Sequence, residues 1–211
     1  MNSVCVLFDL DGTLVDSEAI CNQALLDLLP DLNKPIGDLI KYYRGKKLSV
    51  IFNEIEASIG RRLPVDFEQA YRSRVSELFA IDLEPIPGVV TMLDSLSLPK
   101  CVVSNGPPHK IHQALKRTGI DGHFIGRVFS AYDVGLWKPD PGLLLHAARM
   151  MGAAPNRCAV VEDSEVGIEA ALQAGMKAFQ YVPDKDAGFH KDSVPFFEMS
   201  QLNSLLGQSL Q

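Results

Sequence analysis

VCVLFDLDGTLVDS, residues 4–17, places a short apolar run directly before two aspartates. The run 4–8 is apolar on both faces of an extended chain, which is typical of a strand buried inside a parallel sheet. Four further runs share this length and composition, namely 101–104, 128–130, 158–162 and 178–182. The sequence therefore predicts a sheet of buried parallel strands that begins with the first residues of the chain.

Helical segments are expected between the later strands. Pro107 and Pro108 should open one helix that ends at Gly119, and further helices are expected over 143–151 and from about 164 to 174. Proline near the first turn and glycine just after the last turn are typical helix boundaries. The alternation of strand and helix predicts a doubly wound, Rossmann-like α/β domain with right-handed crossovers.

The segment between the first two strands breaks this alternation. It contains no convincing strand, and four amphipathic helices are expected in it, over 18–29, 36–43, 48–59 and 66–80. Such a connection is far longer than an ordinary crossover. We therefore expect a small α-helical cap domain, residues 17–84, inserted into a core domain of residues 1–16 and 85–211.

The composition indicates a soluble globular protein. The net charge of −6 argues against nucleic acid or an anionic membrane as a partner. The four cysteines form no CxxC pair, and three lie in apolar runs, as reduced thiols in a cytoplasmic protein would. No apolar run is long enough to cross a bilayer, and the first residues show no basic leader, so we expect a cytoplasmic protein.

Polar residues gather after the expected strands, where ligands bind in an open parallel sheet. They are Asp9, Asp11, Ser104, Asn105, Lys138, Glu162 and Asp163. Carboxylates this close to one another repel and need positive charge, and hard oxygen donors favour Mg²⁺. A cluster of carboxylates, Mg²⁺ and lysine suits a phosphoryl group, which one of the carboxylates can attack.

Four motifs resemble those of the haloacid dehalogenase superfamily, in the order that this family requires. They are DLDGTLVDS at 9–17, VVSNG at 102–106, WKPDP at 137–141 and VVEDSEVGIEAALQAGM at 160–176. A lone DxD pair is a weak signal, but four ordered motifs across the whole chain are specific. The resemblance implies a magnesium-dependent enzyme that forms an aspartyl phosphate.

The resemblance also implies a role for each matched residue. Asp9 is the expected nucleophile. Asp11 is expected to protonate the leaving oxygen and then to activate water. Ser104 and the backbone N–H of Asn105 are expected to bind the phosphoryl oxygens, and Lys138 to orient Asp9 and offset its charge.

The metal ligands follow from the same resemblance. Asp9, Asp163 and the backbone carbonyl of Asp11 are expected to bind Mg²⁺. Glu162 is expected to support the metal, either directly or through water. Asp163 or Ser164 can also cap the helix that follows, because both residue types accept hydrogen bonds from a first helical turn.

The helical insert resembles the small cap of the β-phosphoglucomutase-like branch. DGTLVDSE, RGKKL, CVVSNGP and FSAYDVGLWKPDP further resemble a subgroup of sugar-phosphate phosphatases in that branch, with 6-phosphogluconate among the expected substrates. The resemblance implies that the partner is a small phosphorylated metabolite and that the protein is a monomer.

Two alternatives stay open. One is a phosphosugar mutase of the β-phosphoglucomutase type, although Cys21 stands where such mutases carry a histidine, and an arginine expected just after GKKL is missing. The other is a response-regulator receiver, which also has a phosphorylatable aspartate on a doubly wound sheet. The long helical insert argues against a receiver, and Asp11 argues against carbon–halogen cleavage.

A basic loop in the insert is the candidate for substrate selection. Arg44, Lys46 and Lys47 flank Gly45, which permits a tight turn. Three positive charges suit a substrate with a carboxylate as well as a phosphate, and the alternative is a solvated basic surface. His109, next to the second motif, is a further residue that could line the site.

Overall fold

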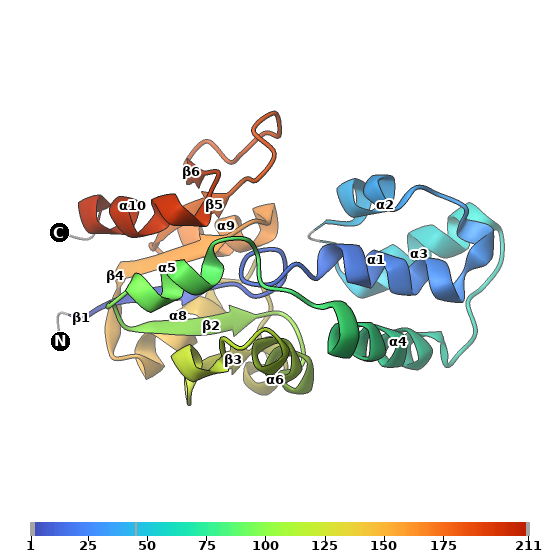
Figure 1. Cartoon of the computed structure of the whole chain (residues 1–211), viewed down its shortest axis with the longest axis horizontal. Helices are drawn as coiled ribbons and strands as arrows, with labels where there is room; N and C mark the ends of the chain where they lie inside the picture. Colours follow the sequence, from blue (N-terminus) through green and yellow to red (C-terminus); the bar gives the residue numbers. More distant parts are fainter. Residues whose placement is uncertain (1–2, 45, 210–211) are drawn as a thin grey trace. The chain divides into compact units, whose positions relative to one another are not determined.

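The computed structural model describes residues 3–44 and 46–209 (Figure 1). The chain divides into two compact units. The core unit consists of the described residues up to Val15 together with those from Glu84 onward, and the helical unit is Asp16–Leu83. The tight turn expected at Gly45 lies outside the described residues.

The core unit is built on a six-stranded sheet in which every neighbouring pair is parallel. The strands are β1 (Ser3–Phe8), β2 (Lys100–Ser104), β3 (Val128–Ser130), β4 (Ala153–Glu162), β5 (Lys177–Tyr181) and β6 (Val194–Phe196). Their order, β3-β2-β1-β4-β5-β6, is that of a doubly wound fold, so the predicted fold class is confirmed. The order reverses between β1 and β4, and ligands bind at this switch point in such sheets.

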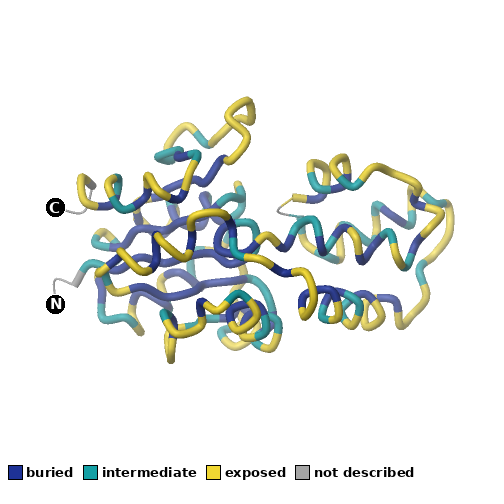
Figure 2. Tube along the Cα trace, viewed as in Figure 1, coloured by how far each residue is buried: buried dark blue, intermediate teal, exposed yellow. Residues whose placement is uncertain are grey.

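Helices cover the sheet on both faces. They are α5 (Val89–Ser95), α6 (Pro108–Arg117), α7 (Ala131–Val134), α8 (Gly142–Met150), α9 (Glu165–Gln173) and α10 (Leu202–Ser209), with short 3-10 turns η2 (Asp121–Phe124) and η3 (Met199–Gln201). Cys5 and Leu7 of β1 belong to one buried apolar cluster with Leu144 of α8 and Ile168 of α9. Helix α5 crosses the opposite face (Figure 1), and β2, most of β1 and the second half of β4 are buried (Figure 2). Burial on both faces explains why these strands have continuous apolar sequences.

One strand, β6, was not predicted from the sequence. β6 has only three residues, with Pro195 at its centre, and it pairs only with β5 at the edge of the sheet. Proline has no backbone N–H and is therefore confined to edge strands, where the sequence signal is weak. Strand β4 also begins at Ala153, five residues before the expected start.

The helical unit contains only helices among its described residues. They are α1 (Glu18–Leu28), η1 (Pro30–Leu32), α2 (Ile36–Tyr43), α3 (Leu48–Ile59) and α4 (Phe67–Asp82). The ring of Phe52 on α3 meets those of Phe67 and Tyr71 on α4 edge-on, at centroid distances of 5.2 and 5.6 Å. Ile55 and Phe79 are fully buried in the same unit, which therefore has an apolar core of its own.

None of the helices in the described part of the chain is long and apolar enough to cross a membrane.

Candidate active site

The loop that follows β1 is held by backbone hydrogen bonds. The carbonyl of Leu10 accepts from the N–H groups of Leu14 and Val15, at 2.9 and 3.0 Å, and Gly12 N–H donates to Val15 O at 2.9 Å. Asp9 N–H donates to Val161 O of β4 at 2.9 Å, which continues the sheet past the end of β1. The two aspartates of this loop are therefore placed on an ordered backbone.

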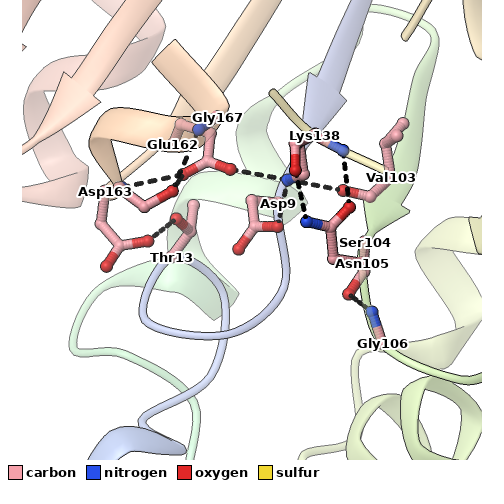
Figure 3. A network of polar contacts seen from close by, with 11 residues as sticks. Asp9, Thr13, Val103, Ser104, Asn105, Gly106, Lys138, Glu162, Asp163 and Gly167 are labelled. Carbon is pink, nitrogen blue, oxygen red and sulfur yellow. Dashed lines mark hydrogen bonds and ion pairs between the residues drawn. The ribbon is translucent and has the colours of Figure 1, made fainter. Parts of the chain in front are cut away.

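Lys138 lies between two carboxylates at the switch point (Figure 3). Its ammonium group donates to Asp9 Oδ1 and Glu162 Oε1, each at 2.6 Å, and to the carbonyl of Val103 at 3.2 Å. These three bonds use all three ammonium donors. The side chains of Asp9, Lys138 and Glu162 are 10%, 4% and 1% exposed. Buried charges are costly unless they are paired, so this network fixes each of the three groups.

The surroundings raise the pKa of both Asp9 and Lys138 above their ordinary values. Burial raises the pKa of Asp9, Glu162 raises it further and Lys138 lowers it, with a result of about 7. Burial alone would lower the pKa of Lys138, but the charges of Asp9 and Glu162 outweigh it and raise that pKa above its usual value. The lysine therefore stays charged, whereas ionised Asp9 needs further positive charge nearby.

Glu162 is bonded through both carboxylate oxygens. Oε1 accepts from Lys138, and Oε2 accepts from the backbone N–H and the hydroxyl of Ser164, both at 2.8 Å. The Ser164 hydroxyl also accepts from Gly167 N–H at 3.2 Å and so caps α9, as expected. A Cβ at position 167 would overlap the Glu162 carboxylate, so glycine is required there. These contacts hold Glu162 in one orientation.

Three carboxylates converge beside Lys138. Asp9, Glu162 and Asp163 each offer an oxygen atom within 4.8 Å of the other two. Thr13 Oγ1 donates to Asp163 Oδ1 at 3.0 Å, and a Cβ at Gly12 would lie 2.5 Å from Asp163 Oδ2. Gly12, at φ +81°, thus lets the loop backbone approach this carboxylate closely. The result is an oxygen-rich site in which the carboxylates outnumber the buried lysine.

Ser104 and Asn105 lie at the end of β2, where the sequence placed them. Ser104 is buried, and its hydroxyl accepts from Gly106 N–H at 3.0 Å, so the hydroxyl proton can point toward a ligand. The Asn105 side chain bonds both backbone groups of Lys138, accepting from N–H at 2.9 Å and donating to the carbonyl at 3.1 Å. Asn105 therefore fixes the loop that carries Lys138, a role that its motif did not reveal.

The structure adds Lys110 to the site. Lys110 lies in the first turn of α6, and its ammonium group donates to Asp11 Oδ1 at 2.8 Å. The side chains of Lys110 and Asp11 are 22% and 30% exposed. His109, which could line the site according to its place beside this motif, is exposed. A lysine two residues into a helix carries no distinctive sequence signal, because most such lysines are solvated.

The basic loop lies in the helical unit, and two of its cationic side chains form ion pairs with carboxylates of the same unit. Arg44 donates to Glu18 from Nε at 2.8 Å and from Nη2 at 2.6 Å. Lys46 contacts Glu54 at 2.9 Å and lies 3.7 Å from the centre of the Tyr42 ring. Lys47 is exposed. Two of the three expected substrate-binding cations are therefore engaged within their own unit.

Fold and site together are those of an α/β enzyme with a carboxylate-rich active site at the edge of its sheet. An aspartate-rich loop follows the first strand of a doubly wound sheet, and a buried lysine joins two carboxylates at the switch point. Such a constellation serves chemistry on a ligand that binds at the carboxyl edge of the sheet.

Comparisons with known proteins agree with this class. The profile of the haloacid dehalogenase-like hydrolases matches residues 4–175. A 6-phosphogluconate phosphatase of Escherichia coli K12 is 35% identical over 205 residues, which cover 95% of this chain and 93% of that protein. The chain belongs to the haloacid dehalogenase-like hydrolase family, and the predictions of this family and of a hydrolytic enzyme are confirmed.

Solved structures show the same fold. A haloacid dehalogenase-like protein of unknown function from Agrobacterium tumefaciens superposes with a TM-score of 0.86 at 27% identity, with all of both chains covered. A family hydrolase from Deinococcus radiodurans, crystallised with bound phosphate and sodium, superposes with a TM-score of 0.81 at 25% identity, covering 98% of this chain and 96% of that one.

Proposed function

We propose that this protein is a magnesium-dependent phosphatase that hydrolyses small phosphorylated carbohydrates through an aspartyl phosphate on Asp9. The observation that carries the proposal is the contact of the buried Lys138 ammonium group with both Asp9 and Glu162 at 2.6 Å. A carboxylate that is buried, oriented and close to positive charge is placed to act as a nucleophile. The bound phosphate in the Deinococcus radiodurans relative supports this chemistry.

The carboxylates of the site fit a magnesium ion. Asp9 and Asp163, together with the backbone carbonyl of Asp11, would hold it, since Mg²⁺ prefers hard oxygen donors. Glu162 would support it indirectly, because both of its oxygens are already bonded to Lys138 and Ser164. When bound, Mg²⁺ supplies positive charge that offsets the carboxylates and the phosphoryl oxygens.

The first chemical step transfers the phosphoryl group to the enzyme. A carboxylate oxygen of Asp9 forms a bond to phosphorus while the bond from phosphorus to the sugar oxygen breaks. Asp11 gives a proton to this leaving oxygen, so that the sugar departs as an alcohol. The Ser104 hydroxyl and the Asn105 backbone N–H stabilise the charge on the phosphoryl oxygens.

The second step returns the enzyme to its starting state. Asp11, now a carboxylate, takes a proton from water, and the water oxygen attacks the phosphorus atom of the aspartyl phosphate. The bond between phosphorus and Asp9 breaks, inorganic phosphate leaves, and Asp9 is again a carboxylate. Lys138 keeps the Asp9 carboxyl group in the same orientation through both steps, because its other two hydrogen bonds anchor it to Glu162 and Val103.

The substrate class rests on the relatives and on the helical unit. The Escherichia coli relative that is 35% identical is a 6-phosphogluconate phosphatase, which favours a phosphorylated sugar acid as the substrate here. We propose the helical unit as a cap that selects the substrate through Arg44, Lys46 and Lys47. Two of these cations would exchange their present acidic partners for an anionic substrate group, and such an exchange is cheap because exposed ion pairs are weak.

Phosphate release tests the proposal. The wild type, Asp9→Asn and the matched control Asp133→Asn, an exposed aspartate of the core unit, are assayed with 6-phosphogluconate, hexose phosphates, phosphoglycolate and nucleotides. Each assay is run with Mg²⁺ and with EDTA. We expect release that needs Mg²⁺ and is lost in Asp9→Asn but not in Asp133→Asn. Activity that survives in Asp9→Asn would refute the proposed nucleophile, and interconversion of sugar phosphates without phosphate release would favour the mutase.

A further inference from the structure

The two aspartates of the DxD loop are held by different lysines. Lys138, which follows β3, bonds Asp9 at 2.6 Å, whereas Lys110, on α6, bonds Asp11 at 2.8 Å. Side chains two residues apart at a strand end can face the same way, yet each carboxylate here has its own cation. The orientation of Asp11 is therefore set by Lys110, whereas that of Asp9 is set by Lys138.

The contact between Lys110 and Asp11 lies close to the hydroxyl of Ser104, the group proposed to bind the phosphoryl oxygens. A Cβ built at Gly106 would be 3.2 Å from Ser104 Oγ, 3.8 Å from Lys110 Cδ and 3.9 Å from Asp11 Oδ2. The loop that carries Gly106 is fixed in turn, because Ser130 Oγ donates to Gly106 O at 2.7 Å. The stem of Lys110, the carboxylate of Asp11 and the hydroxyl of Ser104 thus surround one point on a fixed loop.

We propose that Lys110 is a positioning residue that acts through Asp11, by holding the Asp11 carboxyl group at the leaving oxygen and at the attacking water. This inference rests on the proposed function, because it assumes that Asp11 transfers protons in both steps. Misplacement of a catalytic group by about 1 Å can cost about 100-fold in rate. The hydrogen bond from Lys110 is therefore expected to matter far more for turnover than for stability.

The partial exposure of this pair makes the test practicable. An ion pair with side chains 22% and 30% exposed contributes roughly 0–1 kcal/mol to stability. Lys110→Met should therefore lose little stability, in contrast to a variant of the buried Lys138. Lys116→Met is the matched control, since Lys116 is an exposed lysine on the same helix. Lys110→Arg keeps a cation and a hydrogen-bond donor at the position.

The test is a double-mutant cycle between Lys110→Met and Asp11→Asn with 4-nitrophenyl phosphate as substrate. The leaving group of this activated ester needs no proton, so kcat reports the second step, in which Asp11 activates water, and the slower turnover of Asp11→Asn is followed with more enzyme. We expect Lys110→Met to lower kcat about 10- to 100-fold with Asp11 present, and less than about threefold in the Asp11→Asn background. KM should change less than about threefold, Lys110→Arg should recover most of the rate, and Lys116→Met should match the wild type.

Other outcomes overturn the inference. Equal losses of kcat in both backgrounds would mean that Lys110 acts independently of Asp11, and a rise in KM at constant kcat would mean that it binds substrate. An unchanged kcat in Lys110→Met would mean that Asp11 does not need it. If Lys110→Met fails to fold, an unrecovered rate in a folded Lys110→Arg decides against the inference as well. Failure of the proposed function is seen separately, as wild-type activity that does not depend on Asp9.

Discussion

The core unit and the helical unit both use ion pairs, but they place them differently. In the core unit, Lys138 and its two carboxylate partners are at most 10% exposed. In the helical unit, Arg44 and Glu18 are 41% and 17% exposed, and Lys46 and Glu54 are 29% and 32% exposed. Burying charge costs several kcal/mol per ion, whereas exposed pairs contribute roughly 0–1 kcal/mol.

This difference separates the tasks of the two units. The buried network of the core unit is a fixed device whose geometry cannot change without a large loss of free energy, as a nucleophile and its orienting cation require. The exposed pairs of the helical unit can open at little cost, as groups that exchange a protein partner for a substrate anion require.

Removing the buried lysine should have the largest effect. Lys138→Met leaves Asp9 and Glu162 buried without their shared cation, and we expect a loss of about 3–5 kcal/mol in the free energy of unfolding. Lys46→Met, its counterpart in the helical unit, should cost about 1 kcal/mol or less. Urea denaturation of both variants measures the difference. Equal losses would contradict the distinction between the two units.

Substitution of Gly167, which lies against the Glu162 carboxylate, should have the second largest effect. A Cβ at position 167 overlaps the Glu162 carboxylate, whereas a Cβ at Gly37, on α2 of the helical unit, meets no atom within 4 Å. Gly167→Ala should lose about 1–3 kcal/mol, the usual cost of overpacking, and reduce turnover. Gly37→Ala should keep or gain up to about 1 kcal/mol, because alanine favours a helix. Thermal unfolding compares the two, and a stable, active Gly167→Ala would show that Glu162 is not held as described.

Neutralising Asp9 should stabilise the protein in the absence of a divalent cation. Its pKa is about 7 in the folded chain against an ordinary value of 3.8, so the folded state binds more protons than the unfolded state between these pH values. The stability of the wild type therefore falls as the pH rises through this window. In EDTA at pH 8, Asp9→Asn should be more stable than the wild type by about 1–2 kcal/mol.

This gain should shrink toward zero as the pH is lowered to about 4. Asp38→Asn, on the exposed face of α2 in the helical unit, is the control and should change stability by less than about 0.5 kcal/mol at either pH. A gain in Asp9→Asn that stayed constant with pH would mean that charge on Asp9 is not its cause.

The smallest effect is expected for the pair of Arg44 and Glu18. A double-mutant cycle of Arg44→Met and Glu18→Gln should give a coupling of about 0.2–1 kcal/mol, and about 1 M salt should weaken it, because screening acts on exposed charges. Chemical denaturation at low and high salt measures this coupling. A coupling above about 2 kcal/mol, insensitive to salt, would mean that the helical unit also contains a fixed ion pair.

The sequence could predict the elements whose signals are local. Strands with apolar residues on both faces, such as 4–8 and 158–162, stood out because both of their faces are covered by other elements. The aspartates after β1 and the glutamate that ends β4 could be assigned to one edge because parallel strands end at the same edge. The doubly wound order then followed from the alternation of strands and helices.

The parts that the sequence could not predict depend on contacts between distant residues. Lys110 and Asp11 are 99 residues apart, and Arg44 and Glu18 are 26 apart, so neither pairing leaves a local pattern. The sequence around Gly167 does not show why a glycine is needed there, because the reason is the Glu162 carboxylate that occupies the space beside it. The short strand β6, with its central proline, lies at the sheet edge, where apolar patterning is weak.

Trapping of the covalent intermediate tests the central claim most directly. The enzyme is mixed with substrate and Mg²⁺ and quenched in the first turnover, and borohydride then reduces any acyl phosphate so that the modified aspartate becomes homoserine. Peptide mass spectrometry locates the change. We predict homoserine at position 9 in the wild type and none in Asp9→Asn. Homoserine at another aspartate, or complete turnover without any modified residue, would contradict the assignment of Asp9 as the nucleophile.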